Sequence, residues 1–156
     1  YSNPNLFPRP VTSPALVSHI DFVPTMASLV GSPKVNADWQ GKDYSSLVLD
    51  PGTPGVQDYQ VFTYDDWQAG QAQGPYVSGA SHIVSVREER YKLARYFDPN
   101  GKAAEEFEMY DLAADPTEAT NLAWPDYQRD AEQEAAYQRL LSLLQEVEQT
   151  RLQPLA

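Results

Sequence analysis

The residues best suited to ligand binding lie in one short acidic and aromatic segment. Tyr64, Asp65, Asp66 and Trp67 follow a strand-like run, and His82 begins the next one. Acidic and aromatic side chains in a loop after a strand suit a polar or cationic ligand. Because strand neighbours point to opposite faces, Asp65 and Asp66 share a ligand only if the strand ends there. The alternative is a solvated strand end, the commoner role of exposed aspartates.

The two histidines, His19 and His82, lack the neighbours that catalysis or metal binding requires. A general base needs a positioned partner, and a metal site needs several ligands. His19 at a helix start favours capping or packing, whereas His82 fits packing and pocket lining about equally. The sequence contains no nucleophile elbow, phosphate loop, dinucleotide motif or H-E-x-x-H zinc motif. From the residues alone we predict no catalytic and no metal-binding residue.

Two further polar patterns have structural explanations. The segment 98–101, with the sequence DPNG, resembles a calcium loop, but its glycine comes too early and the final acid is missing. It therefore indicates a turn. A second pattern consists of basic residues that alternate along strands with Glu88 and Glu89 between them, which favours cross-strand ion pairs over an anion site. These basic residues are Arg87, Arg90, Lys92 and Arg95.

Composition restricts the class of protein. A chain of 156 residues has the size of one ordinary domain. The absence of cysteine excludes disulfides, thiol nucleophiles and Cys-ligated zinc, and it assigns no compartment. With 22 acidic against 11 basic residues, a net charge of -11 makes nucleic acid and membrane surfaces poor partners. No apolar run approaches the roughly 20 residues that cross a bilayer, and the oligomeric state is left open.

Apolar residues recur at helical spacing near both ends of the chain. The segment 18–30 predicts a short amphipathic helix that begins at Ser18 or Asp21 and ends before Gly31. Its apolar positions are Ile20, Val23, Met26, Ala27 and Val30. The segment 126–151 predicts one long helix with a single apolar stripe. That stripe consists of Tyr137, Leu140, Leu141, Leu144 and Val147.

Between the helices lie four strand-like runs rich in β-branched and aromatic residues. A short link at 88–90 and the DPNG turn favour an antiparallel meander. The long segment 32–56 has room for only a turn or two of helix near 44–49. The sequence thus predicts an α+β fold: a small antiparallel sheet of about four strands packed by a long C-terminal helix, with a short N-terminal helix and long loops. The strand-like runs are 59–64, 82–87, 91–97 and 107–112.

Three stretches together resemble the C-terminal third of sulfatases of the alkaline-phosphatase superfamily. The resemblance runs from about Val17 to Ala123 and covers most of the chain. In that family this region is a subdomain with a four-stranded antiparallel sheet and a packed helix, which agrees with the elements predicted above. The stretches are VSHIDFVPT at 17–25, WQGKDY at 39–44, and the closing signature formed by RYK at 90–92, MYDL at 109–112, DPTE at 115–118 and NLA at 121–123.

The resemblance implies a formylglycine nucleophile and a calcium ion in a larger N-terminal domain, so no catalytic or metal residue is carried over to this chain. Residues 1–17 are then a proline-rich linker from that missing domain, and 18–156 are the sulfatase C-terminal subdomain. Alone it is expected to be inactive, with an exposed apolar patch where the N-terminal domain of the same protein docks. It would complete the fold and supply one wall of the substrate pocket through the segment 64–67 and the region of His82.

Two other functions stay open at this point. Phosphonate and phosphodiester hydrolases of the same superfamily share parts of these motifs, so the chain also resembles a fragment of such an enzyme. A stand-alone acidic binding module without catalysis, with 64–67 as its ligand site, is the alternative from another class. The start inside a proline-rich loop, without an initiator Met, favours a truncated piece over such a module.

Overall fold

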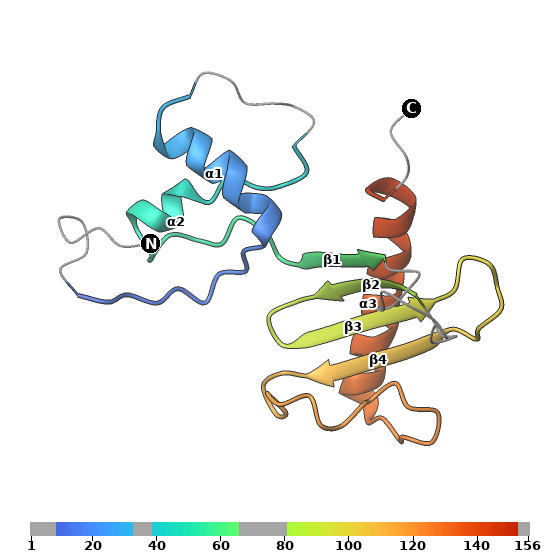
Figure 1. Ribbon diagram of the computed structural model, residues 1–156. Helices are drawn as coiled ribbons and strands as arrows, with labels where there is room; N and C mark the ends of the chain where they lie inside the picture. The colour runs from blue at the N-terminus through green and yellow to red at the C-terminus, as the bar shows by residue number, and fades with distance from the viewer. Residues whose placement is uncertain (1–8, 33–38, 66–80, 153–156) are drawn as a thin grey trace. The chain divides into compact units, whose positions relative to one another are not determined.

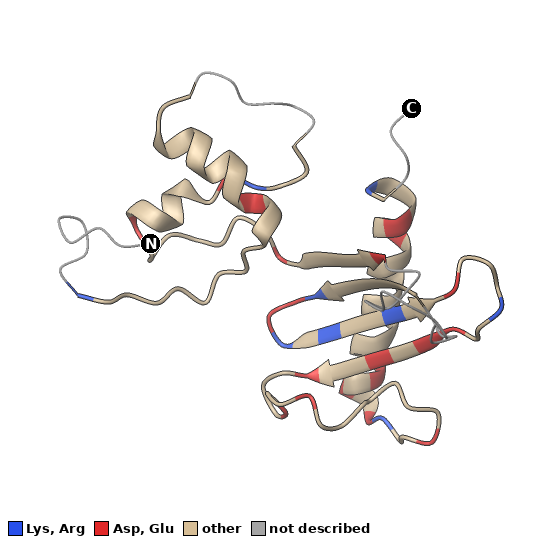
Figure 2. Cartoon of the chain, viewed as in Figure 1, with Lys and Arg blue, Asp and Glu red and all other residues tan. Residues whose placement is uncertain are grey.

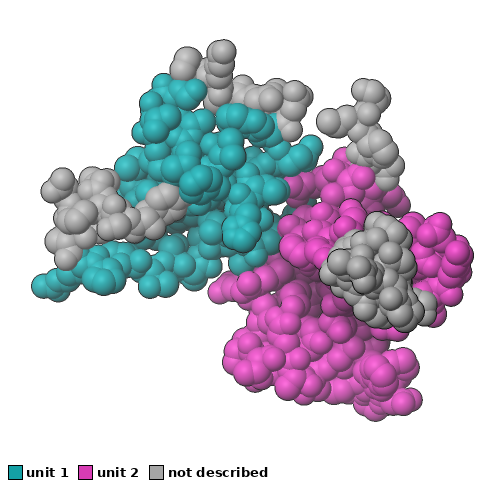
Figure 3. Space-filling view, viewed as in Figure 1, with its two compact units in different colours: residues 1–60 teal, residues 61–156 magenta. Residues whose placement is uncertain are grey.

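Figure 1 shows the computed structural model, which describes residues 9–32, 39–65 and 81–152. The chain separates into two units, residues 1–60 and residues 61–156 (Figure 3). Each unit is considered by itself. In the described parts of the chain, no helix has the length and apolarity that crossing a bilayer requires.

Unit 2 is built on a four-stranded antiparallel sheet in the order β1-β2-β3-β4 (Figure 1). Its centre is a row of three facing residues, since Val86 pairs with Leu93 and Leu93 pairs with Met109. All three side chains are fully buried. The four predicted strands are confirmed, all of them within one residue at each end. The strands are β1 (Gln60–Asp65), β2 (His82–Arg87), β3 (Tyr91–Phe97) and β4 (Glu106–Asp111).

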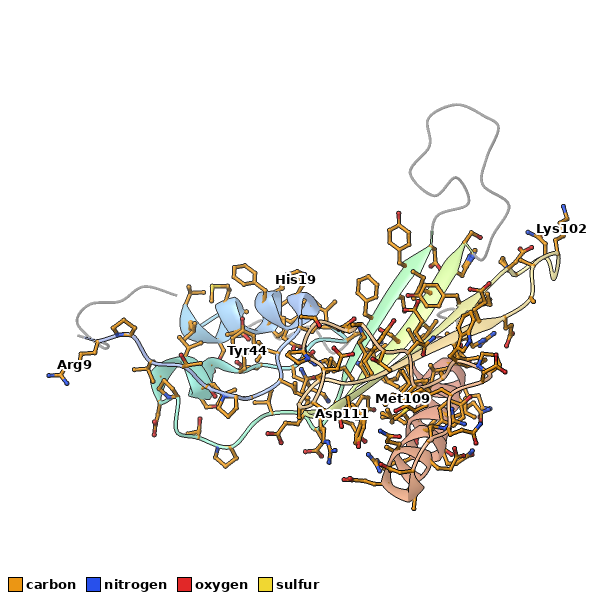
Figure 4. All side chains as sticks on the ribbon, turned by 90° about the horizontal axis from the view of Figure 1, so that it is seen from below. Arg9, His19, Tyr44, Lys102, Met109 and Asp111 are labelled. Atoms are coloured by element: carbon orange, nitrogen blue, oxygen red, sulfur yellow. The ribbon has the colours of Figure 1, made fainter. Side chains whose placement is uncertain are left out.

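The long helix α3 (Ala131–Thr150) covers one face of this sheet and contacts β2 and β3 (Figure 1). Met109, labelled in Figure 4, is a fully buried residue of β4. Three residues of the predicted apolar stripe, Leu140, Leu144 and Val147, are buried together with Ala136. The predicted α+β layer of sheet and helix is therefore confirmed.

The predicted start of this helix at residue 126 is wrong. Asp130 has an extended backbone, and its carboxylate accepts a hydrogen bond from the backbone N–H of Gln133 at 2.8 Å. The Gln133 side chain in turn accepts from the backbone N–H of Asp130 at 3.0 Å. This reciprocal capping box satisfies two donors that a helix start leaves free. It fixes the first helical residue at Ala131.

Unit 1 contains the 3-10 helix η1 (His19–Asp21), the helix α1 (Phe22–Leu29) and the short helix α2 (Ser45–Leu49), and α1 contacts α2. Gly31 follows α1 with a φ of 66°, and its N–H donates to the carbonyl of Ser28 at 3.0 Å. A left-handed glycine after the last turn is a common helix ending. The predicted short N-terminal helix, its ending at Gly31 and the turn near 44–49 are confirmed.

The orientation of α1 differs from the one that its amphipathic pattern predicts. The side chains buried against the rest of unit 1 are those of Asp21, Pro24 and Thr25. Asp21 and Thr25 lie on the buried side because backbone N–H groups of the loop at 42–44 donate hydrogen bonds to their side chains. The predicted apolar face is instead exposed at three positions and half-buried at two: Ile20, Val23 and Val30 are exposed, and Met26 and Ala27 are half-buried.

Candidate functional site

One end of the sheet brings two of the predicted pocket residues together. Asp65 is the last residue of β1, and His82 is the first residue of β2. Their side chains approach to 3.6 Å between Asp65 Oδ1 and His82 Nε2. The Asp65 side chain is 67% exposed and that of His82 is 27% exposed. A carboxylate beside an imidazole at an accessible strand end can accept and donate hydrogen bonds.

Neighbouring side chains hold the His82 ring in place. The Ser81 hydroxyl lies 3.0 Å from His82 Nδ1. The ring of Phe97 lies 5.3 Å from that of His82 between centroids, in a tilted arrangement. The Arg95 guanidinium covers the Phe97 ring at 4.2 Å from its centroid. His82 therefore packs against a neighbouring ring and is partly exposed, and its predicted role in lining a pocket stays a prediction.

Tyr64 does not share the side of β1 on which Asp65 lies. Tyr64 is exposed and precedes Asp65 on the same strand, so the alternation of side chains directs the two toward opposite faces. Asp66 and Trp67 lie outside the described residues. His19 belongs to unit 1, where it is exposed in η1 (Figure 4).

The described residues contain no group of three or more His, Cys, Asp or Glu side chains that could hold a metal ion. The DPNG segment is a turn, as predicted. The Asp98 carboxylate accepts hydrogen bonds from the backbone N–H groups of Asn100 and Lys102, each at 2.9 Å, and these bonds lower the pKa of Asp98. Gly101 has a φ of 68°. Both oxygens of the Asp98 carboxylate therefore accept backbone hydrogen bonds within the turn.

Three of the four basic residues on or beside the strands are paired with carboxylates, but most of these partners lie in loops or in α3 and not on the neighbouring strand that the pattern predicts. Arg95 contacts Glu105 at 3.0 Å and also pairs with Glu148 of α3. Lys92 pairs with Glu118. The partners differ from Glu88 and Glu89, the acids between the strands that the sequence placed nearest. Glu88 instead pairs with Arg139 of α3 at 2.7 Å.

The residues of the first family-like stretch form a buried polar junction in unit 1. Asp21 is 1% exposed, and its carboxylate accepts three hydrogen bonds. The backbone N–H of Ser18 donates at 2.6 Å, the backbone N–H of Lys42 at 2.7 Å and the Gln57 amide at 2.8 Å. Buried charges are tolerated when hydrogen bonds replace the lost water. Asp21 thus joins three separate parts of unit 1.

Thr25 and Gly41 complete this junction. The Thr25 hydroxyl donates to the carbonyl of Asp21 at 2.6 Å and accepts from the backbone N–H of Tyr44 at 3.0 Å. A Cβ on Gly41 would lie 2.0 Å from the backbone oxygen of Ile20, so the two backbone segments meet where only glycine fits. The first and second family-like stretches are therefore in direct contact.

The closing signature forms a second polar junction in unit 2. The Arg90 guanidinium donates to both oxygens of Asp111 at the end of β4, at 3.1 Å from Nε and 2.8 Å from Nη2. Asp111 Oδ1 also accepts the backbone N–H groups of Ala113 and Ala114. The Arg90 hydrogen bonds hold the pKa of Asp111 below its usual value and raise that of Arg90. This pair fixes the turn after β4.

The loop after β4 is held by two further residues of that signature. The Asn121 side chain accepts from the backbone N–H of Met109 at 3.0 Å and donates to the carbonyl of Phe107 at 3.0 Å. Asp115 accepts from the backbone N–H of Thr120 at 2.8 Å, and backbone hydrogen bonds lower its pKa. The signature residues thus dock the loop along the edge of β4.

Several polar residues of the family-like stretches consequently have structural contacts in this chain: Asp21, Thr25, Arg90, Asp111, Asp115 and Asn121. The motif patterns were visible in the sequence, but the roles of Asp21, Thr25 and Asp111 were not, because each depends on a contact distant along the chain. The spacing of an acid and a threonine at the start of a helix was the available signal for the first junction. No similar signal marked the pairing of Arg90 with Asp111.

The fold agrees with the four-stranded sheet and packed helix of a sulfatase C-terminal region, which the sequence resembles. The sequence matches the family of N-sulphoglucosamine sulphohydrolase C-terminal regions over residues 2–150. The chain belongs to that family, and thus to the sulfatase C-terminal regions of the alkaline-phosphatase superfamily. The predicted resemblance is confirmed.

Individual relatives agree with this assignment. An N-acetylglucosamine-6-O-sulfatase of Bacteroides thetaiotaomicron is 29% identical over 116 residues, which are 71% of this chain and 18% of that protein. A protein solved in complex with its substrate D-glucosamine-2-N,6-O-disulfate is similar in structure, with a TM-score of 0.62 and 25% identity. The similarity covers 83% of this chain and 23% of that protein.

A hydrolase named for a different activity is similar as well. The phosphonate monoester hydrolase of Agrobacterium radiobacter is 27% identical, with a TM-score of 0.52 over 85% of this chain and 25% of that protein. The chain therefore spans about a fifth to a quarter of the length of the relatives that it matches.

Proposed function

We propose that this chain is the C-terminal part of a sulfuric ester hydrolase and is inactive by itself. The observation that carries the proposal is the family match over residues 2–150, which covers almost the whole chain. The calcium ion and the formylglycine belong, in this proposal, to an N-terminal domain of the same polypeptide. There they supply the nucleophile and neutralise the charge that develops on the sulfate. Because the described residues hold no candidate metal cluster, no part of that chemistry is assigned to them.

A sulfated glucosamine is the substrate that the comparisons favour. The family is named for N-sulphoglucosamine, and the curated relative is named for the 6-O-sulfate of N-acetylglucosamine. The solved relative carries a glucosamine with both an N-sulfate and a 6-O-sulfate. All three names share the glucosamine ring, while the position of the sulfate differs. We therefore assign the sugar ring, and not one sulfate position, as the common feature of the substrate.

The proposed contribution of this chain to binding is one wall of the substrate pocket. Asp65 and His82 are 3.6 Å apart at one end of the sheet, and Asp65 is largely exposed. Sugar hydroxyls donate and accept hydrogen bonds, and a carboxylate with an adjacent imidazole offers both complements. The wall that we propose rests on Asp65 and His82 alone, because Tyr64 points to the other face of β1 and Asp66 and Trp67 lie outside the described residues. The contacts of Asp65 and His82 would be made with the sugar and not with the sulfate.

Assays on two substrates distinguish a role of Asp65 and His82 in binding the sugar from a general role in catalysis. The polypeptide encoded by the complete reading frame is assayed on a 6-O-sulfated glucosamine and on a small aryl sulfate without a sugar. We expect Asp65→Asn and His82→Ala to reduce kcat/KM for the sugar roughly tenfold, the loss typical of one or two hydrogen bonds. The aryl sulfate should be hydrolysed within about twofold of the unmodified rate. His19→Ala, an exposed histidine of unit 1, is the matched control.

Equal losses on both substrates would contradict the wall, since a residue that contacts only the sugar cannot affect a substrate that lacks it. Unchanged sugar kinetics in both variants would contradict it too. Hydrolysis of neither sulfate by the complete polypeptide would refute the proposed function itself.

A phosphonate monoester hydrolase is the second candidate, and the similarity to the Agrobacterium enzyme at 27% identity favours it. The same polypeptide is assayed on a phenylphosphonate monoester. A kcat/KM at least tenfold higher for the phosphonate than for any sulfate ester would establish this candidate over the first.

A further inference from the structure

A row of stacked side chains runs from the Asp65–His82 pair along one face of the sheet. His82 of β2 pairs with Phe97 of β3, and their ring centroids lie 5.3 Å apart. Arg95 lies two residues before Phe97, so both side chains point to the same face. The guanidinium carbon of Arg95 is 4.2 Å from the centroid of the Phe97 ring. The stacked row therefore consists of Asp65, His82, Phe97 and Arg95, all within unit 2.

Two carboxylates fix the guanidinium of Arg95. Its Nη1 donates to Glu148 of α3, and its Nη2 donates to Glu105 at 3.0 Å. Figure 2 shows basic residues on β3 and acidic residues on α3. The side chains of Arg95 and Glu148 are 20% and 24% exposed, so water screens this pair less than a pair on the surface. A planar guanidinium that is held at both Nη atoms keeps its face on Phe97.

Packing alone does not require a charged residue at position 95. The nearest positions on the same face are all apolar: Leu93 and Phe97 on either side along β3, and Val84 and Phe107, which pair with Arg95 from β2 and β4. An ion pair in such surroundings often stabilises a fold no more than an apolar residue of similar volume does. The stability of the layer therefore leaves the arginine unexplained, whereas holding the Phe97 ring in one orientation uses its planar charged group.

We propose that Arg95 is a positioning residue for the sugar-binding wall formed by Asp65 and His82. This inference rests on the proposed function, and it adds a residue that controls the same site without contacting substrate. Anchored on Glu148, Arg95 holds the Phe97 ring against His82, which keeps His82 Nε2 3.6 Å from Asp65 Oδ1. A side chain that is fixed before binding loses less conformational freedom when the sugar binds.

Arg129 supplies a matched control in the same unit. Its guanidinium carbon lies 4.3 Å from the centroid of the Tyr137 ring, and its Nε pairs with Glu134 at 2.6 Å. Its side chain is 21% exposed, close to the value for Arg95. Glu134 and Glu148 lie near opposite ends of α3. Arg129→Lys therefore removes the same kind of stacked ion pair without touching the stacked row.

Ring-current shifts of the His82 ring protons report the position of Phe97 without any substrate. The 156-residue chain has two histidines, so the spectrum of His19→Ala assigns the His82 signals. We expect Phe97→Leu to remove the shift and Phe97→Tyr to keep it. Arg95→Lys retains the charge but not the planar group, so it should move the signals toward their Phe97→Leu positions. Arg129→Lys should leave them unchanged. Unchanged His82 signals in Arg95→Lys, or equal changes in the two lysine variants, would overturn the proposal.

A second variant tests the anchor on α3 with Arg95 unchanged. Glu148→Gln replaces the ion pair by a neutral hydrogen bond, which is weaker. It should move the His82 signals in the same direction as Arg95→Lys, and it decides the question if Arg95→Lys does not fold. Glu146→Gln, at an exposed acid of the same helix, is the control and should leave His82 unchanged. Equal effects of the two glutamine variants would contradict the anchor.

Kinetics of the complete reading-frame product test the effect on sugar binding. Arg95→Lys should raise KM for a 6-O-sulfated glucosamine roughly threefold and leave kcat unchanged, because it weakens ground-state and transition-state binding equally. The small aryl sulfate, which lacks the sugar, should keep its KM within about twofold, as should both substrates with Arg129→Lys. A fall in kcat on both substrates would show a general structural effect and overturn the proposal, as would an unchanged KM with displaced His82 signals.

The two kinds of measurement also distinguish failure of this proposal from failure of the proposed function. A complete product that hydrolyses neither sulfate refutes the proposed function, while the His82 signals still decide whether Arg95 holds the stacked row. An active product with unchanged His82 signals in Arg95→Lys and Glu148→Gln leaves the function standing and refutes the positioning role.

Discussion

The carboxylate of Asp21 accepts a hydrogen bond from the backbone N–H of Lys42 at 2.7 Å, and so joins the start of the first helix to a loop far along the chain. The same carboxylate binds Ser18 and Gln57. One buried side chain therefore determines the path of three segments. This relationship gives the acid a structural role in the stretch that resembles sulfatases.

Replacing Asp21 by asparagine should loosen unit 1. The amide keeps the shape of the side chain but turns an NH2 group toward one of the three donors, which leaves a buried donor unpaired. We expect a loss of about 1–3 kcal/mol of local stability. Faster amide exchange at Lys42 and Tyr44 would measure it. Asp58→Asn, at an exposed aspartate of the same unit, makes the same charge change and should leave these amides unaffected.

Gly41→Ala should be more damaging than Asp21→Asn. The new Cβ would lie 2.0 Å from the backbone oxygen and 2.5 Å from the backbone carbon of Ile20, so backbone must move. We expect loss of the contact between 18–25 and 41–44, seen as chemical-shift changes throughout both segments. Gly55→Ala is the control, since its Cβ would meet Ala15 at an ordinary 3.5 Å. An unchanged spectrum for Gly41→Ala would show that this backbone contact does not exist.

The pairing of Arg90 with Asp111 should make unit 2 sensitive to acid. The hydrogen bonds from Arg90 lower the folded-state pKa of Asp111 below its unfolded value of about 3.9. The resulting stabilisation is present above that unfolded value and is lost as the pH falls through the lower, folded pKa. Asp111→Asn should cost about 1–3 kcal/mol at neutral pH.

Urea unfolding at several pH values measures this effect. The difference between the unmodified chain and Asp111→Asn should shrink as the pH falls below about 4. Glu89→Gln, at an exposed acid beside Arg90, should follow the unmodified chain throughout. A difference that stays constant with pH would contradict the role of the Asp111 charge.

Two tyrosines of β3 should respond in opposite ways to loss of the hydroxyl. The Tyr91 hydroxyl is buried without a hydrogen-bond partner among the described residues, whereas the Tyr96 hydroxyl donates to Glu108 at 2.8 Å. Removing an unpaired buried polar group is neutral or stabilising, and removing a paired one costs about 1 kcal/mol. Thermal unfolding should place Tyr91→Phe at or above the unmodified chain and Tyr96→Phe below it. The reverse order would contradict these contacts.

Leu140→Ala should destabilise the layer of α3 on the sheet by about 2–5 kcal/mol, because a fully buried leucine leaves a cavity. Leu141, the next residue, is half-buried, so Leu141→Ala should cost less than half as much. Chemical denaturation of both variants compares the same atom change on two faces of one helix. Equal losses would mean that α3 is rotated relative to the sheet.

Local patterns predicted the elements of unit 2, and long-range contacts decided the rest. Alternating residues bounded by turn signals set the strands to within a residue or two. The start of α3 was missed because residues 126–130 are compatible with a helix and only the reciprocal bonds of Asp130 and Gln133 exclude it. The face of α1 was missed because the loop at 42–44 places polar backbone against its inner side.

The candidate site was predictable only in part for the same reason. Adjacent strand ends place Asp65 and His82 side by side, and the sequence suggested both residues. The sequence also predicts that Tyr64 and Asp65 point to opposite faces, because they are neighbours on one strand. By contrast, the ring packing that holds His82, through Phe97 and Arg95, depends on the register of β2 against β3.

The central claim is that this chain completes a larger sulfuric ester hydrolase and has no activity alone. Sulfate release from a sulfated glucosamine tests it most directly, with the 156-residue chain and the complete reading-frame product assayed at equal concentration. We expect multiple turnovers from the complete product and none above the uncatalysed rate from the chain alone. Turnover by the 156-residue chain alone, or by neither protein, would contradict the claim.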